Sequence, residues 1–99
     1  MILVSGFNVY PNEVEDVIAE LDGVVEVGVG GEPDERTGES IKAFVVSSDP
    51  ALDQDRVLEH CRNSLTNYKR PRSVVFVDEI PKSPVGKILR RLLREMNGD

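Results

Sequence analysis

The sequence predicts an α+β domain in which a small mixed sheet, about three main strands plus an N-terminal β-hairpin, packs against three helices. Three observations predict this class. Apolar residues recur at helical spacing in three separate segments. Between them, runs rich in valine and isoleucine have the length and flanking turn residues of strands. The chain of 99 residues is long enough for one domain with a modest core, over residues 1–99.

The N-terminal part predicts a hairpin followed by a helix. Residues 2–10 read as two short extended pieces around Gly6, with SGFN as the turn. Pro11 suits the first position of a helix, and Gly23 suits the stop after it. The apolar face of this helix is expected to consist of Val14, Val17, Ile18 and Leu21.

Two strands are expected in the middle of the chain. Residues 24–30 alternate, which places Val25, Val27 and Val29 on one face. Residues 32–39 read as a polar loop and residues 40–47 as the second strand. Because a short loop joins the two strands, antiparallel pairing is favoured.

The C-terminal half predicts helix, strand and helix. Asp53 is a candidate N-cap for a helix that ends at or before Pro71. A strand over residues 73–78 and a proline- and glycine-rich loop follow, and then a helix that starts at Lys87. The inner stripes of the two helices are expected to be Val57, Leu58, Cys61 and Leu65, and then Ile88, Leu89, Leu92, Leu93 and Met96.

Composition excludes several classes of protein. A hydrophobic fraction of 39% and a charged fraction of 30% fit a soluble globular domain, with no apolar run long enough to span a membrane. The start MILVSG is too short and uncharged for a signal peptide, so we expect a cytoplasmic protein. His60 and Cys61 are adjacent, and neighbouring helical residues do not face each other, so a structural role is favoured over a catalytic pair. No cluster of metal-ligand residues is present in the sequence.

The net charge of −6 is unevenly spread, with +3 over residues 80–99 and −9 over the rest. An acidic body with a basic tail is poorly suited to nucleic acid and suits a local anionic ligand or an acidic partner surface. The basic residues of the final helix fit a solvated face, or a surface for nucleic acid, membrane or an anionic substrate. They are Lys87, Arg90, Arg91 and Arg94, predicted to lie near one face opposite the leucines.

Two basic positions invite a binding role. A lysine at a helix N-terminus is electrostatically unfavourable, so Lys87 is expected to meet a negatively charged partner. The pair Gly86–Lys87 does not complete a phosphate-binding Walker loop, because Pro81 and Ile88 stand where that motif needs glycine and serine or threonine. The loop YKRPR, residues 68–72, could bracket a nucleotide between its ring and its guanidinium groups, although a helix-terminating loop would look much the same.

Three segments, residues 2–15, 31–46 and 68–95, together resemble the C-terminal domain of the AMP-forming adenylating enzymes. Within this superfamily the likeness is greatest to bacterial long-chain fatty acid–CoA ligases. The resemblance implies a two-step reaction with ATP, coenzyme A and Mg²⁺. A fatty acid and ATP form an acyl-adenylate, and coenzyme A then displaces AMP. It also implies that Lys87 enters the active site for the first step, where an ammonium group offsets charge on the carboxylate and α-phosphate.

For the second step the resemblance implies that the domain rotates and presents its hairpin to coenzyme A. The expected coenzyme A-binding residues are Ser5, Gly6, Tyr68, Arg70 and Arg72. Thr37 stands where some relatives have a tryptophan that stacks on adenine. The expected partner is the large N-terminal adenylation domain, because the hinge of the family falls just before Met1, and the chain alone is expected to be inactive. Any peripheral membrane association would come only through the complete enzyme. The alternative is a free-standing small α+β binding module for an anionic ligand or partner protein.

Overall fold

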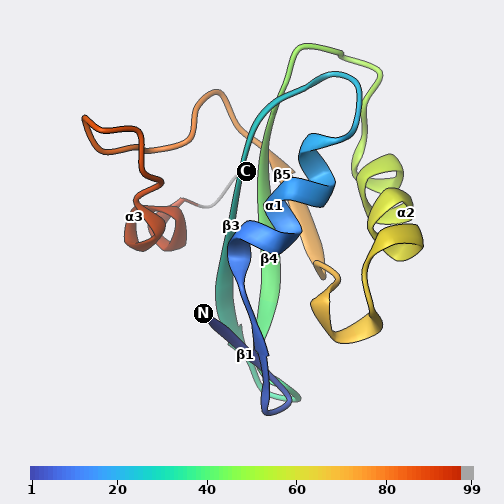
Figure 1. Cartoon of the computed structure of the whole chain (residues 1–99), viewed down its shortest axis with the longest axis vertical. Helices are drawn as coiled ribbons and strands as arrows, with labels where there is room; N and C mark the ends of the chain where they lie inside the picture. The colour runs from blue at the N-terminus through green and yellow to red at the C-terminus, as the bar shows by residue number, and fades with distance from the viewer. Residues whose placement is uncertain (97–99) are drawn as a thin grey trace.

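The computed structural model describes residues 1–96, so Asp99, counted in the basic tail, lies outside the described residues. Nine elements follow one another along the described residues, and Figure 1 shows how the labelled ones are arranged. They are β1 (Ile2–Val4), β2 (Phe7–Val9), α1 (Pro11–Ala19), β3 (Val24–Asp34), β4 (Gly38–Ser47), α2 (Gln54–Ser64), the 3-10 helix η1 (Asn67–Lys69), β5 (Ser73–Phe76) and α3 (Arg90–Glu95). The predicted α+β class is confirmed.

The sheet is mixed and is organised around β4. Strand β3 pairs with β4 antiparallel along nearly its whole length, as the short connection between them predicts. On its other side β4 meets β1 at Gly38 and runs parallel to β5 from Lys42 to Val45. β3 is therefore an edge strand, and its outward backbone groups need partners from elsewhere.

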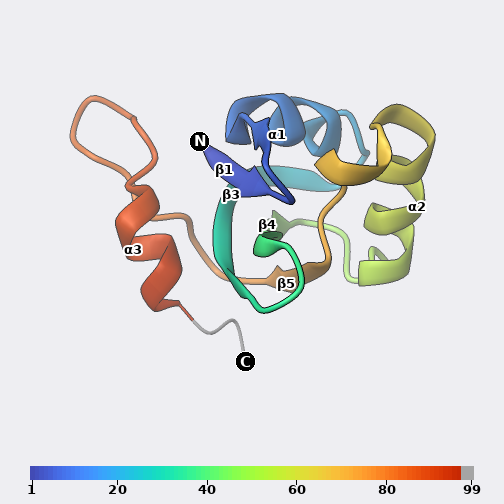
Figure 2. The same ribbon diagram turned by 90° about the horizontal axis from the view of Figure 1, so that it is seen from below.

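The two faces of the sheet are covered differently. One face, with Val29, Ile41, Ala43 and Val45, packs on α1, α2 and the hairpin strands. The other face carries a smaller cluster of Phe44, Ile80 and Leu93, the last from α3. In Figures 1 and 2, α3 and α2 lie at opposite sides of the molecule.

Local sequence signals explain the two longer helices. Pro11 begins α1, and the predicted residues Val14 and Ile18 are fully buried. Asp53 caps α2 by accepting a hydrogen bond from the Arg56 backbone N–H at 2.9 Å, as predicted. Gly23, with φ of +93°, ends the turn after α1 in the left-handed conformation.

The predicted β3–β4 region differs from the structure in two places. The register shifts between Val24 and Glu26, so Val25 is the extra residue of a β-bulge and is 59% exposed instead of sharing a face with Val27 and Val29. The predicted polar loop 32–39 is mostly strand, because pairing continues to Asp34 opposite Gly38.

The final helix also differs from its prediction. Helix α3 starts at Arg90, three residues later than expected, and Leu93 alone among its leucines is fully buried. Leu89 and Leu92 are partly exposed, while Ile88 and Met96 pack at the margin of the smaller cluster. The predicted basic face opposite the leucines is wrong for Arg90, which points into the molecule on the same side as Leu93.

Candidate functional site

Lys87 lies on a tightly hydrogen-bonded loop and not at the start of a helix. A bridge between Lys82 and Ile88 closes the loop, and the Leu89 N–H donates to the Pro81 carbonyl at 2.9 Å. Because this pairing uses residues up to 88, the chain turns helical only at Arg90. The predicted effect of a helix dipole on Lys87 is therefore wrong.

The backbone of Lys87 is held on both sides by Ser83. Its carbonyl accepts a bond from the Ser83 N–H at 2.8 Å, and its own N–H donates to the Ser83 hydroxyl at 3.2 Å. Gly86, with φ of +87°, makes the turn, and its N–H donates to the Ser83 carbonyl at 2.9 Å. Within residues 1–96 the exposed Lys87 side chain has neither an ion pair nor a hydrogen bond. The loop thus presents an ammonium group to solvent on an ordered base.

The hairpin between β1 and β2 turns at Ser5 and Gly6. Their φ angles of +50° and +84° are those of a two-residue type I′ turn, which matches the twist of the flanking strands. The Ser5 N–H donates to the Thr37 carbonyl at 2.8 Å, so the hairpin rests on the β3–β4 turn. Asp34 orders that second turn by accepting from the N–H groups of Arg36 and Thr37, and these bonds lower the pKa of its carboxyl.

Most of the predicted coenzyme A-binding residues meet around one cavity of about 100 Å³ beside this hairpin. Gly6, at the hairpin tip, is next to this group and does not line the cavity. Tyr68 stacks on Phe7, and Lys69 pairs with Glu13 at 2.9 Å, a bond that raises the pKa of the lysine. The lining residues are Val4, Ser5, Thr37, Ser40, Ile41, Asn67, Tyr68, Arg70 and Arg72.

The two arginines of this cavity differ in what they already bind. Arg70 donates from Nε to the Leu65 carbonyl at 2.8 Å and from Nη2 to the Arg62 carbonyl at 3.1 Å. Both carbonyls belong to the C-terminal end of α2, so Arg70 caps that helix. Arg72 is exposed, and no hydrogen bond of its guanidinium is formed within residues 1–96. Arg72 therefore has more donors available for an anionic ligand.

The lysine loop and the hairpin lie in different parts of the domain. In Figure 1 the loop before α3 projects at the upper left, whereas the hairpin tip is at the bottom. The view in Figure 2 separates them again. Lys87 is thus apart from the cavity that brings Ser5, Tyr68, Arg70 and Arg72 together. The domain has two candidate surfaces rather than one site.

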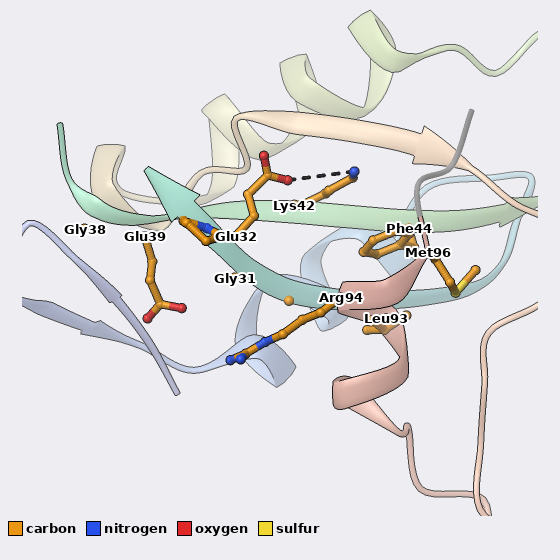
Figure 3. A pocket seen from close by; sticks show the side chains of 11 residues that line it. Gly31, Glu32, Gly38, Glu39, Lys42, Phe44, Leu93, Arg94 and Met96 are labelled. Carbon is orange, nitrogen blue, oxygen red and sulfur yellow. Dashed lines mark ion pairs between the residues drawn. The ribbon is translucent and has the colours of Figure 1, made fainter. Parts of the chain in front are cut away.

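A larger hollow of about 430 Å³ lies beside α3 and is shown in Figure 3. Its floor is glycine backbone of β3, its wall is Phe44 and Leu93, and Lys42 pairs with Glu32 at its rim at 3.8 Å. None of the predicted site residues lines it. Among residues 1–96 no group of three or more His, Cys, Asp or Glu side chains could hold a metal ion, and no helix could cross a membrane.

An inward ion pair between Glu15 and Arg90 was not predicted from the sequence. Glu15 is 8% exposed and accepts from the Val29 N–H at 2.8 Å and from Arg90 Nη2 at 3.2 Å. The helical spacing in the sequence could have revealed this pair. Glu15 precedes Ile18 by three residues and Arg90 precedes Leu93 by three, so both charged side chains lie on apolar helix faces.

Comparison with known proteins decides the family. The model of the AMP-binding enzyme C-terminal domain matches residues 13–87. The chain belongs to this family. It is 58% identical over 95 residues to a long-chain-fatty-acid–CoA ligase of Salmonella typhimurium, covering 96% of the chain and 17% of that relative. A CoA ligase of Rhodococcus jostii, named for a propanoyl group that carries a methyl-dioxo-octahydroindenyl substituent, is 50% identical over 96 residues. The match covers 96% of the chain and 19% of that protein.

Solved structures agree with this assignment. The chain superposes on a fatty acyl CoA synthetase of Mycobacterium tuberculosis with a TM-score of 0.91 and 44% identity, covering 99% of the chain and 20% of that structure. For the ATP-bound MatB of Rhodopseudomonas palustris the TM-score is 0.89 and the identity 38%, covering 98% and 20%. The chain therefore spans about a fifth of the length of the relatives it matches.

Proposed function

We propose that this chain is the C-terminal lid domain of an ATP-dependent, AMP-forming fatty acid–CoA ligase and works against a larger adenylation domain of the same enzyme. The observation that carries the proposal is the exposed Lys87 on its hydrogen-bonded loop, in a chain 58% identical to a long-chain-fatty-acid–CoA ligase. Fatty acid, ATP and coenzyme A would be the substrates.

In the first half-reaction the fatty acid carboxylate attacks the α-phosphate of ATP and pyrophosphate leaves. Negative charge gathers on the attacking and phosphoryl oxygens, and the Lys87 ammonium would lower their repulsion. Because the backbone of Lys87 is already fixed by hydrogen bonds, less conformational entropy would be lost when its side chain enters the active site. Mg²⁺ is expected with ATP, but the described residues include no cluster of three or more His, Cys, Asp or Glu side chains to hold it, so we assign it no step here.

In the second half-reaction the thiol of coenzyme A attacks the acyl carbonyl and AMP leaves. The Ser5–Gly6 hairpin would approach the pantetheine arm, with Gly6 presenting backbone alone. Tyr68, Arg70 and Arg72 would face the nucleotide and its phosphates. The separation of this surface from Lys87 supports a rotation of the domain between the two steps.

The test measures the two half-reactions separately in the complete ligase. Lys87→Ala is expected to slow acyl-adenylate formation by about 10²–10³, the usual loss for one preorganised electrostatic contact. Lys87→Arg is expected to rescue it only in part, because a planar fork replaces a compact ammonium. Thioester formation from supplied acyl-adenylate should stay near normal. Equal losses in both steps would make Lys87 structural and would refute the two-surface mechanism.

The isolated chain is proposed to be inactive. Among its described residues no cluster of three or more His, Cys, Asp or Glu side chains could hold a metal ion, and its sequence has no complete phosphate-binding loop. ATP–pyrophosphate exchange by the purified chain, abolished by Lys87→Ala, would contradict this assignment.

A further inference from the structure

The loop that carries Lys87 has few attachments to the rest of the domain. Ile80 anchors its incoming side, and α3 anchors its outgoing side through Leu93 and Arg90. Helix α3 has six residues and no side-chain N-cap, so it is too short to be stable without tertiary contacts. The position of Lys87 therefore depends on what holds these few anchors.

Arg90 is the charged anchor nearest to Lys87, three residues along the chain. Its Nη1 donates to the Val29 carbonyl at 2.8 Å and its Nη2 to Glu15 Oε1 at 3.2 Å, while Nη1 also contacts Glu15 Oε2. Glu15 Oε2 accepts from the Val29 N–H at 2.8 Å as well. Both outward backbone groups of Val29, on the edge strand β3, are thus paired through this network.

The contact between Arg90 and Glu15 fixes the orientation of both side chains as well as their separation. A fork-to-fork arginine–carboxylate contact fixes the orientation of both groups, unlike a point charge. The carboxylate is rigidly placed, because Glu15 is in the middle of α1 and its side chain is 11% exposed. Removing Arg90 would leave a buried charge with fewer partners and free the start of α3.

We propose that Glu15 and Arg90 are positioning residues for the adenylation step, holding the Lys87 loop at a fixed orientation to the sheet. This inference rests on the proposed role of Lys87. The ion pair touches no substrate and acts through the loop alone. A second attachment, between Lys82 and Glu26, is more open, with side chains 40% and 31% exposed. Within residues 1–96 neither side chain bonds to a backbone group, so this attachment contributes less.

The experiment uses the complete ligase, with Arg90→Met as the test variant and Lys82→Met as the matched control from the same loop. Misplacing a catalytic group by about 1 Å can cost up to 10²-fold in rate, so Arg90→Met is expected to slow acyl-adenylate formation by roughly 10- to 100-fold. Lys82→Met is expected to slow it by less than about threefold. Thioester formation from supplied acyl-adenylate should be unchanged in both variants.

A double-mutant cycle with Lys87→Ala separates positioning from general destabilisation. If Arg90 acts only through Lys87, Arg90→Met causes no further slowing once Lys87 is alanine. Further slowing in that background, or equal loss in both half-reactions, would overturn the proposal. If Arg90→Met does not fold, Glu15→Gln serves instead, because its amide oxygen can still accept from Val29; it should slow adenylation selectively. A normal rate of acyl-adenylate formation in Lys87→Ala would refute the proposed function itself. A slow rate in Lys87→Ala together with a normal rate in Arg90→Met or Glu15→Gln would refute the positioning role alone.

Discussion

The ring of Phe7 stacks on the ring of Tyr68, with centroids 4.5 Å apart and planes inclined by 25°. Phe7 comes from β2 and Tyr68 from η1, so the contact ties the N-terminal hairpin to a segment far away in the sequence. It stands beside the cavity that Tyr68 lines with Ser5 and Arg72. Phe7 is a surface residue of the hairpin, and through this stack it holds Tyr68 at the candidate coenzyme A surface.

Phe7→Ala is expected to lower the thermal stability of this chain. An aromatic pair contributes about 0.5–1.5 kcal/mol beyond its buried area, which corresponds to a fall in Tm of roughly 2–12 °C for a domain of this size. Tyr10→Ala is the matched control, since Tyr10 is equally exposed, follows the same hairpin and has no ring partner among residues 1–96. Equal shifts for the two variants would show that the stack contributes nothing specific.

Substitutions of the two cavity arginines, Arg70 and Arg72, should have different effects in the complete ligase. Arg72→Ala is expected to raise the KM for coenzyme A about tenfold or more, because a hydrogen bond to a charged group contributes ~1.5–3 kcal/mol. Its melting temperature should not change, since the exposed guanidinium makes no hydrogen bond in residues 1–96. Arg70→Ala should lower the melting temperature as well, because it uncaps α2. An unchanged KM in both variants would remove the coenzyme A assignment.

Cys61 should make stability fall in alkaline solution. Burial raises the pKa of its thiol to about 11, from an ordinary value of 9.0. The folded state therefore holds the proton more tightly, and this contribution is complete below pH 9 and is lost as pH rises towards 11. Urea unfolding from pH 8 to 11 should show the stability gap between the wild type and Cys61→Ala narrowing, by at most about 2 kcal/mol. A gap independent of pH would contradict the prediction.

The helices α1 and α2 could be predicted from the sequence because their start, cap and apolar stripe depend on residues close together in the chain. Pro11, the apolar stripe of α1 and the Asp53 cap each act within one turn of helix, so α1 and α2 could be predicted from the residues alone. The Ser5–Gly6 turn was expected for the same reason, although the structure narrows it to two residues. The mixed sheet follows from the strand patterns and the connection lengths.

What could not be predicted depends on pairing between distant segments. The late start of α3 results from the Lys82–Ile88 bridge, and the exposure of Val25 results from the register of β3 on β4. The residues alone marked the loop 68–72 as a possible nucleotide-binding segment, and the family resemblance added Ser5 and the coenzyme A role. The structure brings Ser5, Tyr68 and the two arginines of that loop, Arg70 and Arg72, around one cavity. Their part in coenzyme A binding stays a prediction. The helix-capping bonds of Arg70 could not be seen without the fold.

Gly28 offers a test of the smaller core cluster, with Gly30 as a control on the same face of β3. A methyl group on Gly28 would lie 3.1 Å from both Ile80 Cγ2 and Leu93 Cδ1, whereas on Gly30 it would meet Leu93 at an ordinary 4.0 Å. Ile80 and Leu93 are the apolar anchors at the two ends of the Lys87 loop, and with Gly28→Ala both side chains must shift by a few tenths of an ångström. We expect Gly28→Ala to destabilise this chain by about 1–3 kcal/mol and, in the complete ligase, to slow acyl-adenylate formation more than thioester formation. Gly30→Ala should leave both properties close to wild type. Should the two variants behave alike in both assays, the seating of α3 on Gly28 would not govern the placement of Lys87.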